Sequence, residues 1–389
     1  MSKKIAIYTE HPLTVYGGLE RVLASAYKCL SQKGHSVRIV VIAPPKALVS
    51  PIIDWFKEIP VYKYGMKPSR LLRLMCWLRL LFRKPNKSIM RAVMDDLRRN
   101  GIPDLALVTN PELISELNLV MKRTGAKTCV YYWDHGLTSV SSYWLSGRRG
   151  LANLRFWIYA WLYLQIFKKT IRSVDGVLAI STGIKEFFFR FIQKEKIHVI
   201  FNPVEKQGEK LARPANPPKF IYVGRLTDFD KNISFLLQSL SRLKDEVWSL
   251  DIFGSGPDQN KLKNLSLKFG LENKIRWLGF FSEPFSLEQE CTALLLTSRF
   301  EGFPLVLVEA NLHGIPVISS NCQAGPGDIV IEGVNGYLFP EGDLETFVNI
   351  LRKVIRGELN FASPEEIART AERFSPEAFY ERLKSALGL

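Results

Sequence analysis

Short apolar runs alternate with helix-length segments along the chain, and this alternation restricts the fold more than any other feature of the sequence. The first run, Lys4 to Tyr8, is followed by Gly17-Gly18, a helical stretch from Leu19 to Lys33 and a second apolar run from Ser36 to Ile42. Buried parallel strands are near-continuous apolar runs, and the helices that connect them cover the sheet. The pattern therefore predicts an α/β fold built on doubly wound parallel sheets.

The alternation occurs in two consecutive series. A stretch rich in proline and charge, Asn202 to Pro218, separates them. Because 389 residues exceed what one hydrophobic core usually organises, we predict two domains, residues 1–202 and 203–374. The further strands that we expect are 105–109, 128–132 and 176–180 in the first series and 220–223, 249–253, 275–278, 293–297 and 316–319 in the second.

Positive charge is concentrated in the first half of the chain. The net charge is +15, because residues 1 to 200 carry 32 Lys or Arg against 13 Asp or Glu, whereas the remainder carries 21 against 25. Such an excess favours an anionic partner, either a lipid surface or nucleic acid. No nucleic-acid recognition motif accompanies the charge, so we expect an anionic membrane surface and no nucleic acid.

Two segments of the first half, Arg70 to Lys84 and Leu151 to Lys169, combine apolar and aromatic residues with basic ones. Within the second, Phe156 to Phe167 is uncharged for about twelve residues, whereas a transmembrane helix needs roughly twenty. We therefore expect no span. The segment either covers the sheet as a core helix or docks on the membrane interface through its aromatic and basic side chains.

The cysteines and the first residues indicate a cytoplasmic protein. Five cysteines, at positions 29, 76, 129, 291 and 322, are scattered without a Cys-x-x-Cys pair, which fits neither a disulfide framework nor a zinc knuckle. The sequence starts with Met-Ser-Lys-Lys and continues directly into a strand pattern, without the apolar core of a signal peptide.

Two glutamates with seven residues between them, Glu301 and Glu309, form the sharpest motif. They follow the run Ala293 to Thr297, and Pro304 suits the first position of a helix. Glu301 and the free amides of residues 302 to 305 would then meet at a helix amino terminus, which can bind hydroxyls and developing negative charge. Glu309 would lie several ångströms further along and could bind a second diol. The alternative is that both glutamates are solvated helix residues.

A buried strand ending in glycine and arginine, Tyr222-Val223-Gly224-Arg225-Leu226, opens the second series, and Lys231 follows the arginine by six residues. Ligands bind at the carboxyl ends of strands in open α/β sheets, and Arg225 with Lys231 suits a diphosphate whose charge grows as it leaves. Both cations could instead pair with the local acids Asp228 and Asp230. Asp228-Phe229-Asp230 lies in a hydrophilic loop where the cations already supply positive charge, so we expect no metal.

Three weaker features follow other predicted strands. Gly254-Ser255-Gly256-Pro257 resembles the start of a dinucleotide fingerprint without its third glycine. Gly17 and Gly18 either permit close approach of the backbone to a phosphate or form a plain turn. His135 either holds a transferred sugar or is a packed or capping histidine.

These residues together resemble family 4 of the retaining glycosyltransferases, and within it the lipopolysaccharide-core galactosyltransferases of bacteria. The resemblance covers nearly the whole chain. It is strongest from Phe220 to Pro340, where Val-Gly-Arg-Leu, Phe-Glu-Gly-Phe-Pro, Gly314-Ile315-Pro316-Val317 and Asn335-Gly336 stand in the family's order. It implies the GT-B fold, in which two Rossmann-like domains face a cleft, and a closing helix, residues 375–389, that crosses back to the first domain.

The resemblance also implies roles for individual residues. Glu309 would bind the ribose of a nucleotide sugar, Arg225 and Lys231 its diphosphate, and Glu301 its sugar. Arg225, Lys231, Glu301 and His135 form the expected catalytic set. The other residues expected to contact the donor are Gly17, Gly18, Gly254, Phe281, Gly302, Phe303, Pro304 and Leu305. Many relatives carry glycine beside the lysine, where this chain has Asp230-Lys231-Asn232.

We therefore expect a metal-independent, retaining hexosyltransferase that takes galactose or glucose from a UDP-sugar as co-substrate and needs no other cofactor. Its acceptor would be a lipid-linked or membrane-bound glycan of lipopolysaccharide, O-antigen, capsule or related polysaccharide synthesis. The protein would work in the bacterial cytoplasm, peripherally at the inner face of the membrane. A nucleotide-sugar epimerase on the same fold and a non-catalytic nucleotide-sugar-binding protein are the alternatives.

Overall fold

The chain forms two compact units, Met1–Phe201 with Phe379–Leu389, and Asn202–Ala378. The computed structural model describes residues 2–11, 13, 17–43, 56–65, 86–135, 154–206, 208, 211–281, 285 and 290–389, and only the backbone of residues 154–160, 162 and 163. The basic segment 70–84 lies outside the described residues.

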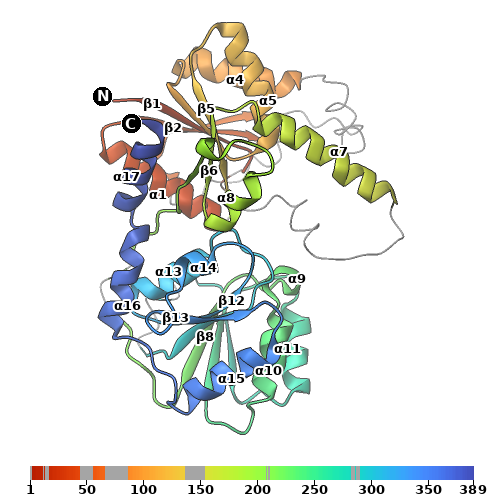
Figure 1. Ribbon diagram of the computed structural model, residues 1–389, viewed down its shortest axis with the longest axis vertical. Coiled ribbons are helices and arrows are strands. Elements are labelled where there is room, and N and C mark those ends of the chain that lie inside the picture. Colours follow the sequence, from red (N-terminus) through yellow and green to blue (C-terminus); the bar gives the residue numbers. More distant parts are fainter. Residues whose placement is uncertain are drawn as a thin grey trace. The chain divides into compact units, whose positions relative to one another are not determined.

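The first unit is built on a seven-stranded parallel sheet in the order β3-β2-β1-β4-β5-β6-β7 (Figure 1). The strands are β1 Lys4–Thr9, β2 Ser36–Ala43, β3 Val61–Gly65, β4 Leu105–Val108, β5 Cys129–Asp134, β6 Gly176–Ala179 and β7 Ile197–Val199. The helices are α1 Gly18–Gln32, α4 Lys87–Asn100, α5 Pro111–Thr124, α7 Leu154–Ile171, α8 Thr182–Phe188 and α17 Pro376–Leu387, with a 3-10 turn at Lys194–Lys196. The strand order reverses between β1 and β4, which is where ligand sites form in open α/β sheets.

The second unit repeats this plan on a six-stranded parallel sheet in the order β10-β9-β8-β11-β12-β13. Its strands are β8 Lys219–Val223, β9 Ser249–Phe253, β10 Ile275–Gly279, β11 Ala293–Leu296, β12 Val317–Asn321 and β13 Gly336–Pro340. Its helices are α9 Asp228–Lys231, α10 Ile233–Ser241, α11 Gln259–Lys268, α13 Leu305–Leu312, α14 Pro326–Ile329, α15 Leu344–Ile355 and α16 Pro364–Ala371, followed by a 3-10 turn at Glu372–Phe374. Here the order reverses between β8 and β11.

Apolar packing holds each unit together. In the second unit the rings of Phe235, Phe339 and Phe347 stack in pairs with centroids 4.3 to 6.1 Å apart, which joins α10 and α15 to the sheet. In the first, α17 contributes Phe379, whose ring stacks on the buried Trp133 at 5.9 Å. The hydroxyl of Tyr380 lies 3.1 Å from His35 Nε2. From Phe379 onward, the last helix thus packs in the core of the first unit.

The prediction of doubly wound parallel α/β sheets is confirmed. Three strands were not predicted, β3, β7 and β13, and each lies at an edge of its sheet. Helix α7 buries Phe167 and Ile171 but exposes 58% of Trp161. Within the part of the chain that the structure describes, no helix has both the length and the hydropathy required to cross a bilayer.

Candidate functional site

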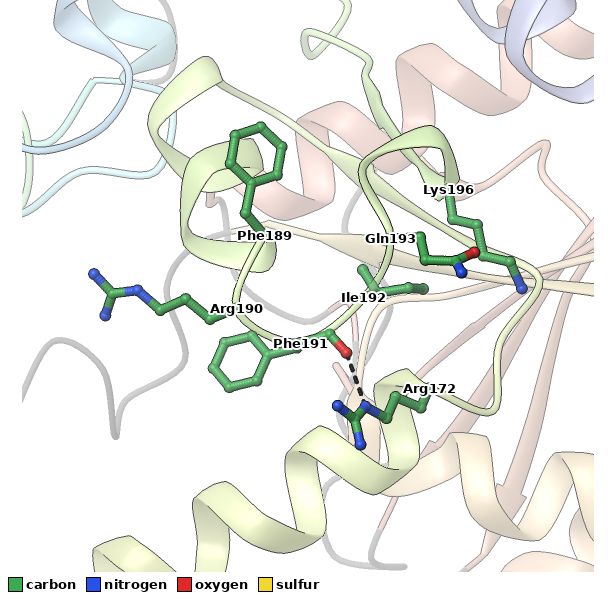
Figure 2. A pocket seen from close by; sticks show the side chains of 7 residues that line it. All are labelled: Arg172, Phe189, Arg190, Phe191, Ile192, Gln193 and Lys196. Atoms are coloured by element: carbon green, nitrogen blue, oxygen red, sulfur yellow. Dashed lines mark hydrogen bonds between the residues drawn. The ribbon is translucent and has the colours of Figure 1, made fainter.

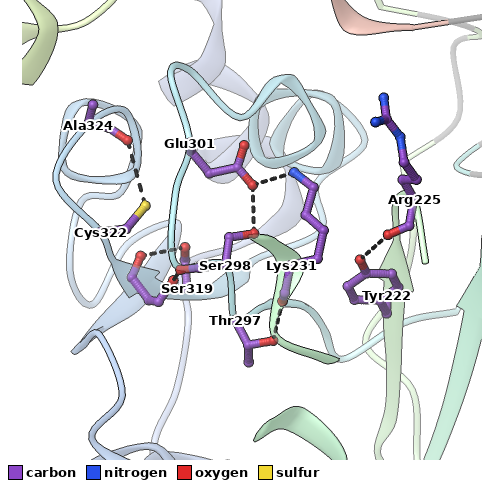
Figure 3. A network of polar contacts seen from close by, with 10 residues as sticks. Tyr222, Arg225, Lys231, Thr297, Ser298, Glu301, Ser319, Cys322 and Ala324 are labelled. Atoms are coloured by element: carbon purple, nitrogen blue, oxygen red, sulfur yellow. Dashed lines mark hydrogen bonds and ion pairs between the residues drawn. The ribbon is translucent and has the colours of Figure 1, made fainter. Parts of the chain in front are cut away.

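The centre of the candidate site is the carboxylate of Glu301, which lies beyond the carboxyl end of β11 (Figure 3). Its Oε1 accepts hydrogen bonds from Lys231 Nζ at 2.7 Å and from the hydroxyl of Ser298 at 2.6 Å. The side chain of Glu301 is 10% exposed and that of Lys231 21%. Both donors bind the same oxygen, and Oε2 has no hydrogen-bond partner among the described residues. The carboxylate is therefore fixed in orientation with one oxygen available.

Lys231 reaches Glu301 because its backbone is tied to the end of β11. The hydroxyl of Thr297 donates to the carbonyl oxygens of Lys231 at 3.1 Å and Asn232 at 3.2 Å. Asn232 ends the single turn α9 with φ of 54°, a left-handed conformation that asparagine tolerates better than most residues. Asn232, next to Lys231, thus adopts a backbone conformation in which glycine is the usual residue.

Glu301, and not a local acid, is the partner of Lys231. The carboxylate of Asp228 instead accepts from Lys261 Nζ at 2.9 Å and from the amide of Ser234 at 2.7 Å. Burial of Lys231 favours the neutral amine, but the charge and hydrogen bond of Glu301 outweigh this effect and raise the pKa of Lys231 above its usual value. Lys231 is therefore a cation at every physiological pH.

Arg225 and Gly254 lie at the ends of neighbouring strands, β8 and β9. The hydroxyl of Tyr222 donates to the carbonyl oxygen of Arg225 at 3.2 Å, while the Arg225 side chain is exposed and its guanidinium has no partner among the described residues. Gly254 has φ of 153°, and a Cβ there would overlap the carbonyl oxygen of Gly224. Glycine is thus required at position 254 for the turn after β9 to pack against the turn after β8.

The prediction that Pro304 occupies the first helical position is wrong. Pro304 has an extended ψ of 93° and precedes the first residue of α13, Leu305. Its ring packs on Gly325, where a Cβ would lie 2.5 Å from Pro304 Cδ. Because proline has no N–H, position 304 supplies no amide donor at this helix start. Glu309 lies in the second turn of α13, and its carbonyl oxygen is 2.8 Å from His313 Nδ1.

The remaining predicted residues are dispersed. Phe281 follows β10, is 42% exposed and contacts Phe253 edge-on with centroids 5.6 Å apart. In the first unit, Gly17 precedes α1 in an extended conformation and Gly18 is its first residue. His135 follows β5 with its ring 4.4 Å from that of Trp133. Burial, and then the charge of His11, lower the pKa of His135 to about 3, so its imidazole is neutral.

Sequence reasoning missed two groups. The first is Ser298, for which a serine two residues after a buried strand and three before a motif glutamate is a usable signal. Glu10 directly follows β1 at the reversal point of the first sheet, and its carboxylate accepts a hydrogen bond from the Asn110 side-chain amide at 2.9 Å. Burial, followed by the charges of Glu112 and Glu116, raises the pKa of Glu10 to about 8. No motif in the sequence indicates that shift.

Comparisons with known proteins concern the family and the fold of the chain. Residues 203–374 match the model of glycosyl transferases group 1, and residues 16–207 match that of glycosyltransferase family 4. The lipopolysaccharide 1,6-galactosyltransferase of Salmonella typhimurium is 36% identical over 260 residues, which are 64% of this chain and 72% of that protein. The apo structure of the lipopolysaccharide outer core galactosyltransferase WaaB superimposes with a TM-score of 0.78 at 28% identity over 99% of both chains. Anabaena HepE in complex with UDP shares the fold, with a TM-score of 0.72 at 19% identity over 99% of both chains.

Proposed function

Since the chain belongs to glycosyltransferase family 4, a family of retaining hexosyltransferases with the GT-B fold, we propose that it moves a hexose from a UDP-sugar to a membrane-associated glycan. The observation that carries the proposal is the Glu301 carboxylate, held by Lys231 and Ser298 after β11, while the exposed Arg225 follows β8, the neighbouring strand at the reversal point of the second sheet. The activity named for the Salmonella relative supports galactose, and the HepE complex supports UDP.

Lys231 and Arg225 can neutralise a diphosphate in different ways. An ammonium has three N–H donors, of which Lys231 uses one for Glu301, so two are available for phosphate oxygens. Arg225 adds a guanidinium that is not engaged by the described residues. Because negative charge on the diphosphate grows as the glycosidic bond breaks, these cations stabilise the transition state more than the bound donor. Under this proposal the reaction requires no divalent metal.

Retention of configuration follows if the acceptor hydroxyl attacks the face from which the diphosphate departs. The bond from the anomeric carbon to the diphosphate breaks, the bond to the acceptor oxygen forms, and the acceptor proton passes to the departing diphosphate oxygen. Glu301 stabilises the positive charge that develops on the sugar through Oε2, since its other oxygen is already saturated. It is not a general base in this scheme. Glu309 binds the ribose, and the amides before α13 contact the sugar.

We place the reaction at the inner face of the cytoplasmic membrane. The positive charge of the first 200 residues supports an anionic surface as partner, and the lipopolysaccharide activity of the Salmonella relative supports a lipid-linked acceptor.

A donor screen tests the proposal. Free UDP is followed with a panel of UDP-sugars, with and without an extract of lipid-linked glycans, for the wild type and for Glu301→Ala. We expect release from UDP-galactose that requires the extract and falls by orders of magnitude in the variant. Conversion of the donor without acceptor would indicate an epimerase, and donor binding without turnover a binding protein.

A further inference from the structure

A shallow pocket of about 530 Å³ opens in the first unit between the end of α7 and the turn that follows α8 (Figure 2). Three of its seven lining residues are cations and none is an acid. The lining residues are Arg172, Phe189, Arg190, Phe191, Ile192, Gln193 and Lys196. This pocket belongs to neither the Glu301 cluster nor the β1–β4 reversal point.

One cation of the pocket is anchored by a hydrogen bond, and the other two make no described ion pair. Arg172 Nε donates to the carbonyl oxygen of Phe191 at 3.1 Å, which anchors that guanidinium at the rim (Figure 2). Arg190 and Lys196 are exposed and make no ion pair with the described residues. Figure 2 shows the Arg190 and Lys196 side chains on opposite sides of the hollow. Their charge is therefore available to an anionic partner.

Exposed aromatic rings accompany these cations. Phe189 is 37% exposed, and Lys194 Nζ lies 4.9 Å from the centre of its ring. Trp161 and Lys169 lie on α7, and Arg172 follows its last residue with its amide still bonded to the carbonyl oxygen of Lys168 at 3.1 Å. These three exposed residues are spaced by eight and three, which places them on one face of the helical turns. Trp161 lies roughly 16 Å along the helix from Arg172 at 1.5 Å per residue. The basic and aromatic side chains thus extend well beyond the pocket.

Buried aromatic rings pack α7 against α8 and the turn that follows α8. Phe167 of α7 contacts Phe188 at 6.0 Å and Phe191 at 5.6 Å, measured between ring centroids. Phe167 and Phe188 are almost completely buried. The exposed residues on the two elements are therefore held in a fixed arrangement.

We propose that Trp161, Lys169, Arg172, Phe189, Arg190 and Lys196, the basic aromatic patch, rest on the surface of an anionic bilayer. Lipid phosphates bind the cations around the pocket, while Trp161 and Phe189 insert among the headgroups, a position that aromatic rings favour. Charge complementarity supports this partner, because residues 154–200 carry eight Lys or Arg against three Asp or Glu. The inference rests on the proposed function, which places the acceptor at a membrane, and assigns the contact to defined residues.

Vesicle co-sedimentation tests the patch. The variant Arg190→Ala/Lys196→Ala removes two cations of the patch whose side chains make no described hydrogen bond. The control is Lys122→Ala/Arg123→Ala, which removes the same amount of positive charge from the exposed end of α5. With phosphatidylglycerol vesicles at low salt we expect the patch variant to bind roughly thirtyfold more weakly than the wild type. The control should lose far less, and Phe189→Ser should weaken the binding that persists at high salt. Phosphatidylcholine vesicles should bind none of these proteins appreciably.

An equal loss of vesicle affinity in both double variants would overturn the assignment of the patch as the membrane contact, because it would indicate a general effect of net charge. Binding of inorganic phosphate or single-stranded RNA, without binding of vesicles, would also overturn it. UDP release with a detergent-dispersed acceptor separates this inference from the proposed function. Normal release with no vesicle binding refutes the patch alone, whereas vesicle binding with no release from any donor refutes the proposed reaction alone.

Discussion

Replacing Ser298 by alanine removes one of the two donors that orient the Glu301 carboxylate. The Ser298 side chain is fully buried, and its hydroxyl lies 2.6 Å from Glu301 Oε1, whereas Lys231 remains 2.7 Å from the same oxygen. A hydrogen bond to a charged group contributes about 1.5 to 3 kcal/mol. Because Lys231 still satisfies the oxygen, we take the lower end, about 1.5 kcal/mol, which corresponds to a roughly tenfold loss of kcat/KM.

The assay is steady-state release of UDP, with thermal unfolding measured on the same samples. Ser320→Ala is the matched control, because the Ser320 hydroxyl is equally buried but donates to the carbonyl oxygen of Ser298 at 2.6 Å and does not contact Glu301. Ser298→Ala should lose about 1.5 kcal/mol of stability and Ser320→Ala about 1 kcal/mol, whereas only Ser298→Ala should lose about tenfold in kcat/KM. Equal activity of the two variants would refute the positioning of Glu301 by Ser298.

Three further predictions concern other residues. Arg225→Ala should leave the melting temperature unchanged, because the side chain is exposed, but should lower kcat/KM by about a hundredfold; a normal rate would exclude Arg225 from the reaction. Gly254→Ala should reduce the free energy of unfolding in denaturant by about 3 kcal/mol, whereas Gly342→Ala, with φ of 79° and open space around it, should cost about 1 kcal/mol. Glu10 has its folded pKa raised to about 8 from 4.5, so the folded state keeps a proton that the unfolded state releases. The stability that this group contributes is present below pH 4.5 and is lost as the pH rises towards 8. Glu10→Gln should flatten this dependence of the free energy of unfolding on pH. An unchanged pH profile in the variant would contradict the raised pKa of Glu10.

The central strands could be predicted from the sequence because they are buried on both faces and therefore appear as continuous apolar runs. The missed strands β3, β7 and β13 are edge strands, and β3 has one buried residue among five. In β3 and β7 a polar residue, Lys63 or His198, interrupts the apolar run. The start of α13 was misplaced by one residue because the packing of Pro304 on Gly325 is a tertiary contact.

The pairing of Lys231 with Glu301 could not be read from the sequence for a related reason. Seventy residues separate the two side chains, and they meet because β8 and β11 are neighbours in the sheet. The sequence offered Asp228 as a nearer partner, but Lys261, on α11, occupies that carboxylate. Motif spacing identified the residue types of the candidate site, and strand order determined which of them are in contact.

The most direct test of the donor site is calorimetric titration of UDP into the wild type, Arg225→Ala and Glu309→Gln, with Glu341→Gln as an exposed control in the same unit. We predict that the wild type and the control bind UDP equally and that each site variant binds about tenfold more weakly or worse, because each loses a charge-assisted hydrogen bond to the nucleotide. Wild-type affinity in both site variants would contradict the assignment of this strand edge as the donor site.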